Sequence, residues 1–224
     1  MAGKDGENLG RYEGAVRVEW LSDGRLVRLL EPFSFVDAFT MRWDVPSGWK
    51  VDGASIPQVL WSLVGSPFTG LYRDASVIHD YYCDTKSRPW GAVHRVFYDA
   101  MLASGVGKLR AKVMYAGVCW GGPRWREQQT SHYETALRDY LHDSRTTSNR
   151  VHQPILHDDE RSIRRFASVE TVAYQYPLAQ ADLDFLEQQL GSADVAAGDI
   201  PDFVEEKIQQ LNLSPLYTRP AKSG

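Results

Sequence analysis

Cysteine is scarce in this chain of 224 residues, which contains only Cys83 and Cys119. Two cysteines exclude the disulfide framework of a small secreted domain and suit a reducing compartment. The chain also lacks any run of roughly 20 apolar residues, the length that a helix needs to span a membrane. Its polar first nine residues lack the apolar segment of a signal peptide. These absences predict a soluble cytoplasmic protein without a transmembrane segment, and they leave a virion or a non-classical export route open.

An excess of positive charge is missing as well, since the formal net charge is −4. Residues 1–129 carry 16 basic and 14 acidic side chains, whereas residues 130–224 carry 9 and 15. Nucleic-acid-binding domains usually show a basic patch or stripe. The nearest approach to one, which we interpret as a solvated helix face, consists of Lys108, Arg110, Lys112, Arg124 and Arg126. Nucleic acid is therefore not an expected partner.

Apolar residues, at 43% of the chain, are plentiful enough for a core, and short strands come first. Alternating apolar and polar residues predict a β-hairpin from strands at 15–20 and 25–30. Two further strand candidates follow at 32–36 and 39–43. The N-terminal part is therefore expected to form a small antiparallel β-sheet.

Helical spacing replaces the alternation after Pro57, which is well placed to open a short helix, with Ser55 as its N-cap. Longer helices are expected at about 72–83, 90–103, 109–120, 130–142, 182–190 and 201–211. Strands followed by helices favour an α+β fold, with a bundle of about four helices after the sheet and a C-terminal helical extension. Three segments are predicted: a flexible leader at 1–11, an α+β domain at 12–126, and a partly irregular acidic extension at 127–224.

The extension offers one candidate surface for a partner. In the helix at 201–211, the apolar residues Ile200, Val204 and Ile208 share a face. We predict that this face docks a protein partner or a second copy of the chain.

The densest group of potentially reactive side chains lies on the helix at 72–83, where His79 and Asp80 are adjacent. A His general base beside a metal-binding carboxylate suits this pair, as does a metal site that uses both. Asp52 precedes the helices in a glycine-containing loop, and His94 lies on the next helix. If the two helices pack antiparallel, His79 and His94 face one another, and Asp52, His79, Asp80 and His94 make a site for zinc or another transition metal.

A purely structural interpretation of the same residues stays open. It has His79 packed in the core with its ring nitrogens satisfied, enclosed by Tyr82, Phe97 and Tyr98. A hydrolase instead requires an accessible pocket around His79 and its carboxylates. Cys83 and Cys119 are interpreted as small buried apolar groups.

Several motifs together resemble a bacterial and phage domain family, the domain-of-unknown-function family numbered 1353, over about residues 12–125. The motifs are VDGASIP at 51–57, GSPF at 65–68, YRDASVIHDY at 72–81 and RVFYDAM at 95–101. The resemblance implies a compact domain often met in phages and prophages. It implies no activity.

A looser similarity links the helices that carry His79 and His94 to the catalytic helices of prokaryotic phospholipase A2. It implies that His79 is the general base and that Asp52 and Asp80 are calcium ligands. His94 then stands where that family has an aspartate that orients the base. An imidazole cannot stabilise a protonated partner imidazole as a carboxylate does. The similarity therefore supports a shared helix pair more than shared catalysis.

Two functional hypotheses follow. The first is a phage or bacterial structural or accessory protein that acts through protein–protein contacts, in the bacterial cytoplasm or in a virion. The alternative is a metal-dependent, phospholipase-like ester hydrolase with His79 as the base, Asp52 and Asp80 as metal ligands, and His94 nearby. The metal is zinc or calcium in that case.

Overall fold

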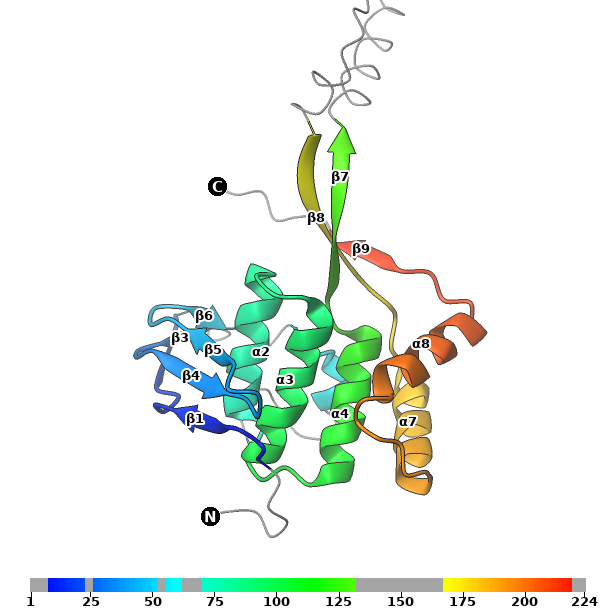
Figure 1. Ribbon diagram of the computed structural model, residues 1–224, viewed down its shortest axis with the longest axis horizontal. Helices are drawn as coiled ribbons and strands as arrows, with labels where there is room; N and C mark the ends of the chain where they lie inside the picture. Colours follow the sequence, from blue (N-terminus) through cyan, green and yellow to red (C-terminus); the bar gives the residue numbers. More distant parts are fainter. Residues whose placement is uncertain (1–7, 23–25, 52–54, 62–69, 132–166, 219–224) are drawn as a thin grey trace, which may run out of the picture. The chain divides into compact units, whose positions relative to one another are not determined.

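The computed structural model describes residues 8–22, 26–51, 55–61, 70–131 and 167–218. It confirms the α+β fold class, with N-terminal antiparallel strands followed by helices (Figure 1). The elements in chain order are β1 Arg11–Glu13, β2 Val18–Trp20, β3 Val27–Leu29, β4 Phe33–Val36, β5 Arg42–Val45, β6 Lys50–Val51, the 3₁₀ helix η1 Gln58–Leu60, α2 Arg73–Thr85, α3 Trp90–Ala103, α4 Lys108–Gly121, β7 Arg124–Ser131, β8 Ala167–Gln175, α7 Gln180–Ser192, α8 Ile200–Gln210 and β9 Leu216–Thr218.

The N-terminal strands form two three-stranded antiparallel sheets, in the orders β1-β4-β5 and β2-β3-β6. The predicted hairpin is confirmed, because Val18 pairs with Leu29 and Trp20 with Val27. In the other sheet, the inward side chains Phe33, Phe35 and Val45 are almost fully buried. The sheets pack on α2, which contacts β5 and β6.

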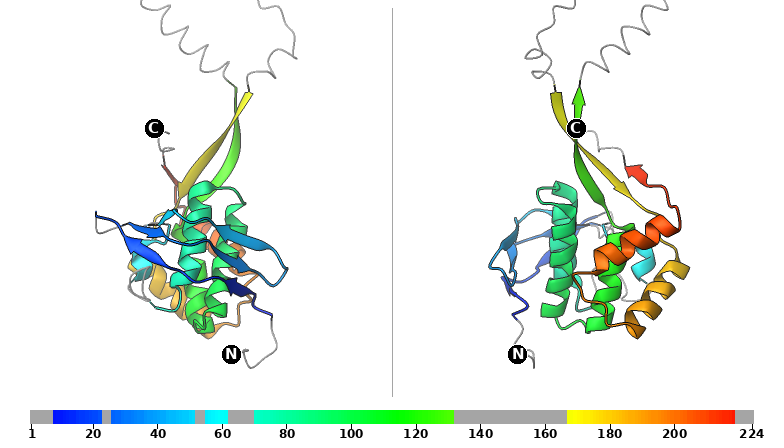
Figure 2. Two further views of the ribbon diagram at one scale, coloured as in Figure 1. Left: turned by 90° about the vertical axis from the view of Figure 1, so that its left-hand side faces the viewer. Right: turned by 45° about the vertical axis from the view of Figure 1, so that its right-hand side comes forward.

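The helices continue outward from this layer in chain order. Helix α2 packs on α3, α3 on α4, and α4 on both α7 and α8 (Figure 1, Figure 2). Every residue of α4 from Ala111 to Gly121 is buried, as expected for a helix enclosed by neighbours. Its Trp120 is fully buried and donates from Nε1 to the Pro177 carbonyl at 2.9 Å. At Gly117, a Cβ would come within 2.6 Å of the Leu60 side chain, so glycine permits η1 to approach α4 closely.

The chain divides into two compact units, of which the first comprises Met1–Trp125 and Ala173–Thr218. The second comprises Arg126–Val172 and Arg219–Gly224, and its described residues are strand residues of β7 and β8. This division differs from the predicted segments, because the first unit takes in α7 and α8. Of the predicted leader, residues 1–7 lie outside the described residues, and Arg11 already begins β1.

The sequence pattern predicts neither β1 and β6 in the N-terminal part nor the three later strands β7, β8 and β9. β7 contains Thr130 and Ser131, where the sequence pattern predicts the start of a helix; the remainder of that predicted helix, 132–142, lies outside the described residues. β8 and β7 are hydrogen-bonded neighbours, and the last three residues of β8 pair antiparallel with β9, which lies in the predicted, partly irregular extension. None of the described helices has the length and apolar character needed to cross a bilayer.

The basic residues along α4 and β7 do not form the predicted solvated face, because Lys112 and Arg124 are buried. Lys112 donates from Nζ to the Val195 carbonyl. Arg124 donates to the Cys119 carbonyl and, at 2.8 Å, to Glu205 of α8. Lys112 thus joins α4 to the segment between α7 and α8, and Arg124 of β7 joins the end of α4 to α8. Only Lys108, Arg110 and Arg126 of the group are exposed.

Candidate functional site

Two helices and one loop segment bring five polar side chains together in the core of the first unit. Helix α2 carries His79, Asp80 and Cys83, helix α3 carries His94, and Ser55 stands shortly before η1. His79 and Cys83 are four residues apart, so they share one face of α2. The packing of α3 on α2 places His94 opposite His79. We call these five residues the His79 cluster.

A chain of short contacts links the cluster. The Ser55 backbone N–H donates to Oδ1 of Asp80 at 3.2 Å, and the Ser55 hydroxyl also bonds that oxygen. The same hydroxyl oxygen lies 3.1 Å from Nδ1 of His79. On the far side of the ring, Nε2 of His79 lies 2.8 Å from Nδ1 of His94. The Asp80 carboxylate is thereby connected to His94 through two intervening side chains.

The proton positions follow from this network. An ionised Asp80 only accepts, so the single hydroxyl proton of Ser55 points to it. The Ser55 oxygen then accepts from an Nδ1–H of His79, which leaves Nε2 of His79 as an acceptor for the Nδ1–H of His94. Nε2 of His94 ends the chain as a bare lone pair, and among the described residues it has no hydrogen-bond partner.

Burial controls the chemistry of the cluster. His79 and His94 are 0% exposed, and Cys83, Asp80 and Ser55 are at most 6% exposed. The His79 ring also packs on Phe97, with 4.7 Å between ring centroids. Desolvation lowers the pKa of His79 to about 3, and it lowers the pKa of His94 well below its usual value. Both imidazoles are therefore neutral at physiological pH.

Cys83 completes the cluster, with its Sγ 3.6 Å from Nε2 of His79. Burial, and then the nearby carboxylates of Asp80 and Asp84, raise the pKa of its thiol well above the usual range. The ligand atoms of His79, Cys83 and His94 all lie within 4.8 Å of one another. By residue type and separation, this trio is able to hold a metal ion.

The predicted site residues are distributed differently. The structure brings His79 and His94 together, as the antiparallel arrangement of the helices required. Asp80 bonds to Ser55 and stands outside the trio with metal-site spacing. Asp52 lies outside the described residues.

The predicted docking face of α8 is placed in the core. Ile200, Val204 and Ile208 are 0–3% exposed. α8 packs on α4 of the same chain, and this packing covers an apolar stripe that the sequence pattern cannot distinguish from an exposed one. A partner surface on the described residues must therefore be sought elsewhere.

Two members of the cluster were missed by the sequence reasoning. Cys83 was interpreted as apolar filling, although its i+4 spacing from His79 was a usable signal. Ser55 was interpreted as a helix N-cap, but η1 has no side-chain cap, and the hydroxyl bonds to Asp80 and His79. Only the tertiary approach of the segment before η1 to α2 shows this pairing.

The cluster holds the elements of a nucleophile–base pair, Ser55 and His79, but in an enclosed form. The Ser55 hydroxyl donates its hydrogen bond to Asp80 and not to the imidazole of His79. In this arrangement His79 is not placed to remove the hydroxyl proton as a base. No atom of His79 or His94 is exposed for contact with a substrate in solution. The arrangement is suited to joining α2, α3 and the Ser55 segment, and to holding an ion.

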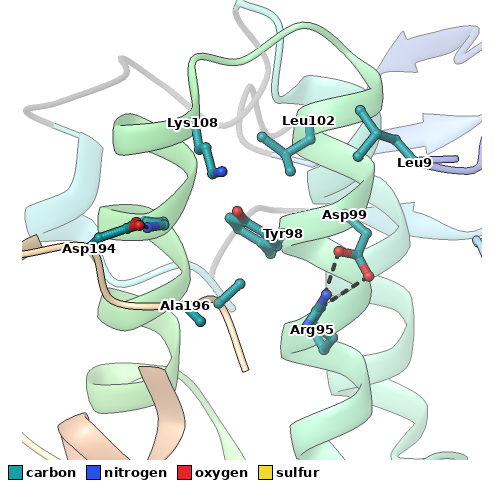
Figure 3. A pocket seen from close by; sticks show the side chains of 10 residues that line it. Leu9, Arg95, Tyr98, Asp99, Leu102, Lys108, Asp194 and Ala196 are labelled. Atoms are coloured by element: carbon teal, nitrogen blue, oxygen red, sulfur yellow. Dashed lines mark hydrogen bonds and ion pairs between the residues drawn. The ribbon is translucent and has the colours of Figure 1, made fainter. Parts of the chain in front are cut away.

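A pocket of about 450 Å³ lies elsewhere in the first unit, between α3, α4 and the segment after α7 (Figure 3). In it, Nε of Arg95 bonds both carboxylate oxygens of Asp99 at 3.1 Å. Burial raises the pKa of Asp99, and the Arg95 charge opposes that shift. None of the residues lining this pocket belongs to the His79 cluster. It gives the cluster no opening to solvent.

A second region of interest is the turn between β4 and β5, residues 37–41, which we call the 37–41 turn. Oδ1 of Asp37 accepts from the backbone N–H groups of Phe39 and Met41, both at 2.9 Å, and Oδ2 accepts from Nε1 of Trp43 at 3.0 Å. Thr40 adopts a left-handed backbone conformation, with φ of 67°. Phe39 is 84% exposed and Met41 50%. The carboxylate thus fixes a turn that displays two large apolar side chains.

Comparisons with known proteins give two relatives from Sinorhizobium fredii (strain NBRC 101917 / NGR234). The uncharacterized protein y4jT is 53% identical over 100 residues, which cover 45% of this chain and 30% of that protein. The uncharacterized protein y4iH is 50% identical over 93 residues, which cover 42% of this chain and 39% of that protein. The chain thus matches well under half of the length of either relative.

No solved structure matches the chain. The comparisons do not support the similarity to phospholipase A2. They confirm the other resemblance over a shorter range, since residues 27–118 match the family described as a protein of unknown function, DUF1353.

Proposed function

We propose that the chain is a non-catalytic accessory component of a bacterial or phage assembly and that it acts through protein–protein contacts. The 37–41 turn is the contact site in this proposal, and the His79 cluster is part of the internal structure. The observation that carries the proposal is the exposed Phe39 on a turn that Asp37 holds in place.

Rigid presentation of an apolar side chain favours binding, because little conformational freedom is lost when a partner covers it. The left-handed Thr40 is a strained choice for a β-branched residue, and such strain is concentrated at functional sites. The turn is anchored to the core through Trp43, which is 2% exposed and lies under the Arg88 guanidinium. The contact surface therefore moves as one piece with the domain.

The hydrolase alternative has weaker support. A general base must lie within hydrogen-bond distance of the group or water whose proton it removes. His79 is fully enclosed, and its two ring nitrogens face Ser55 and His94. A hydrolase based on His79 would need the α2–α3 packing to open.

Site-specific photocrosslinking tests the proposal in the bacterium that carries the gene. A photoactivatable phenylalanine analogue replaces Phe39 in the full chain, and the matched control carries it at Leu211, which is 43% exposed after α8. The expected result is a discrete protein adduct, with a partner or a second copy, from position 39 and not from position 211. The absence of an adduct from position 39, together with ester hydrolysis that a His79→Ala variant loses, would support the alternative.

A further inference from the structure

We infer that His79, Cys83 and His94 form a binding site for a zinc-class divalent transition-metal ion, with Nε2 of His79, Nδ1 of His94 and Sγ of Cys83 as ligands. This inference is independent of the proposed function, because it concerns the interior of the first unit and not the 37–41 turn. It also moves the metal away from the carboxylates that the sequence indicated.

The separations between the ligand atoms are close to those of a zinc site. Zinc bond lengths of about 2.0–2.1 Å to nitrogen and 2.3 Å to sulfur give tetrahedral edges of about 3.3 Å between nitrogens and about 3.6 Å between nitrogen and sulfur. Nε2 of His79 lies 3.6 Å from Sγ of Cys83. It lies 2.8 Å from Nδ1 of His94, where a shared proton now joins the rings. Replacing that proton by the ion requires the two rings to separate by about half an ångström.

The surroundings of His79 are those of a metal ligand. A ligating His commonly donates its second ring N–H to an oxygen, which fixes the tautomer and the ring orientation. Here Nδ1 of His79 faces the Ser55 hydroxyl at 3.1 Å, and that hydroxyl is held by Asp80. The lone pair of Nε2 therefore points to His94. Sγ of Cys83 lies beside the same ring, 3.6 Å from Nε2 and 3.8 Å from Nδ1. Asp80 supports the ligand without binding the ion.

His94 provides an independent observation. Its Nε2 is buried and has no hydrogen-bond partner among the described residues, which is costly for a polar atom. When Nδ1 binds an ion, the ring proton moves to Nε2. Ion binding at Nδ1 thereby turns the unsatisfied lone pair of Nε2 into an N–H group.

Charge and ligand type select the kind of ion. A buried dication needs compensating negative charge. The Cys83 thiolate and the Asp80 carboxylate together supply two negative charges. Imidazole and thiolate ligands suit zinc, whereas calcium takes six to eight oxygen ligands. Because the Cys83 thiol is neutral without an ion, binding releases its proton. The site is thus specific for a thiophilic ion and excludes calcium.

Cobalt(II) is the probe, since it takes the place of zinc and gives a thiolate-to-cobalt charge-transfer absorption when sulfur is a ligand. The full chain is stripped with a chelator and titrated with cobalt and then with zinc. We expect one equivalent of cobalt to bind with the charge-transfer band, and zinc to displace it. The Cys83→Ser variant loses the band. The matched control Cys119→Ser keeps it, because Cys119 is equally buried but lies outside the trio.

A second measurement covers the case in which Cys83→Ser fails to fold. In the wild-type chain, zinc protects Cys83 from alkylation during partial denaturation, and mass spectrometry locates the modified cysteine. The inference is overturned if the wild type binds neither ion, if the band survives in folded Cys83→Ser, or if zinc protects Cys119 instead. Photocrosslinking at position 39 is unaffected by any of these results.

Discussion

The His79 cluster and the 37–41 turn are organised by the same device, a carboxylate that accepts several hydrogen bonds from its own chain. Asp80 accepts from the backbone and hydroxyl of Ser55, and Asp37 accepts from two backbone N–H groups and the Trp43 indole. The first arrangement encloses reactive groups, whereas the second displays unreactive apolar ones. Among the described residues, the reactive side chains of the His79 cluster are thus enclosed, whereas the 37–41 turn leaves two apolar side chains accessible.

The largest expected difference between the two regions is in thiol reactivity. Burial raises the pKa of Cys83 well above its usual value and that of Cys119 to about 12, so neither forms an accessible thiolate. A cysteine introduced as Met41→Cys is exposed. We expect a thiol reagent under native conditions to modify it at least about a thousandfold faster than the two natural cysteines, corresponding to an opening free energy of roughly 4 kcal/mol. Equal rates for Cys83 and position 41 would contradict the enclosure of the cluster.

Among these variants, removal of the buried Asp80 carboxylate should lower the free energy of unfolding most. Asp80→Ala leaves the buried Ser55 donors without their acceptor, and hydrogen bonds to a charged group contribute about 1.5–3 kcal/mol each. Because the two bonds are coupled, we expect a loss of about 3 kcal/mol in the free energy of unfolding, measured with urea. The control Asp84→Ala removes an exposed carboxylate from the same helix and should change stability by less than about 0.5 kcal/mol. Similar losses in both variants would show that Asp80 has no special role.

Removal of the Asp37 carboxylate in the 37–41 turn should lower the free energy of unfolding less. Asp37→Ala removes three hydrogen bonds, but water reaches the turn and replaces part of them, so the expected loss is about 1–2 kcal/mol. Asp37→Asn keeps an acceptor oxygen and should fall between the wild type and the alanine variant. In the photocrosslinking assay at position 39, Asp37→Ala should lower the adduct yield although Phe39 is untouched. An unchanged yield would mean that the fixed turn is not needed for contact.

The smallest effect on stability is expected for Phe39→Ser. The side chain is 84% exposed, so its removal should change the free energy of unfolding by less than about 0.5 kcal/mol. The same change should abolish co-purification of the partner identified by crosslinking. A stability loss of several kcal/mol would show that Phe39 packs in the fold.

Much of the fold was predictable because it is encoded locally. The alternation of apolar and polar residues predicts the β2–β3 hairpin. The spacing of apolar residues predicts the helices that carry His79 and His94 to within a few residues of their observed ends. β7 is polar and carries no such pattern; its strand state depends on pairing with a segment far along the chain. β8 contains Val169, Thr171 and Val172, and such β-branched residues are typical of a strand.

The candidate site was predictable only where it depended on helix periodicity. Two helices with a His each allowed the approach of His79 and His94 to be anticipated. The other members of the His79 cluster depend on tertiary packing. Cys83 becomes a possible ligand because α3 packs over it, and Ser55 belongs to the cluster because its segment approaches α2. The buried Ile200 face shows the same limit, since an amphipathic stripe does not reveal whether its partner belongs to the same chain.

The central claim is that His79 is a neutral member of an enclosed hydrogen-bond network and not an accessible base. The tautomer of His79 tests this claim most directly. Long-range ¹H–¹⁵N spectra of the full ¹⁵N-labelled chain report which ring nitrogen carries a proton, and a His79→Gln variant assigns the signals. The enclosed network requires a neutral His79 at pH 7 with its proton on Nδ1, facing Ser55. A proton on Nε2, or a charged ring, would contradict the account and return His79 to the role of an accessible base.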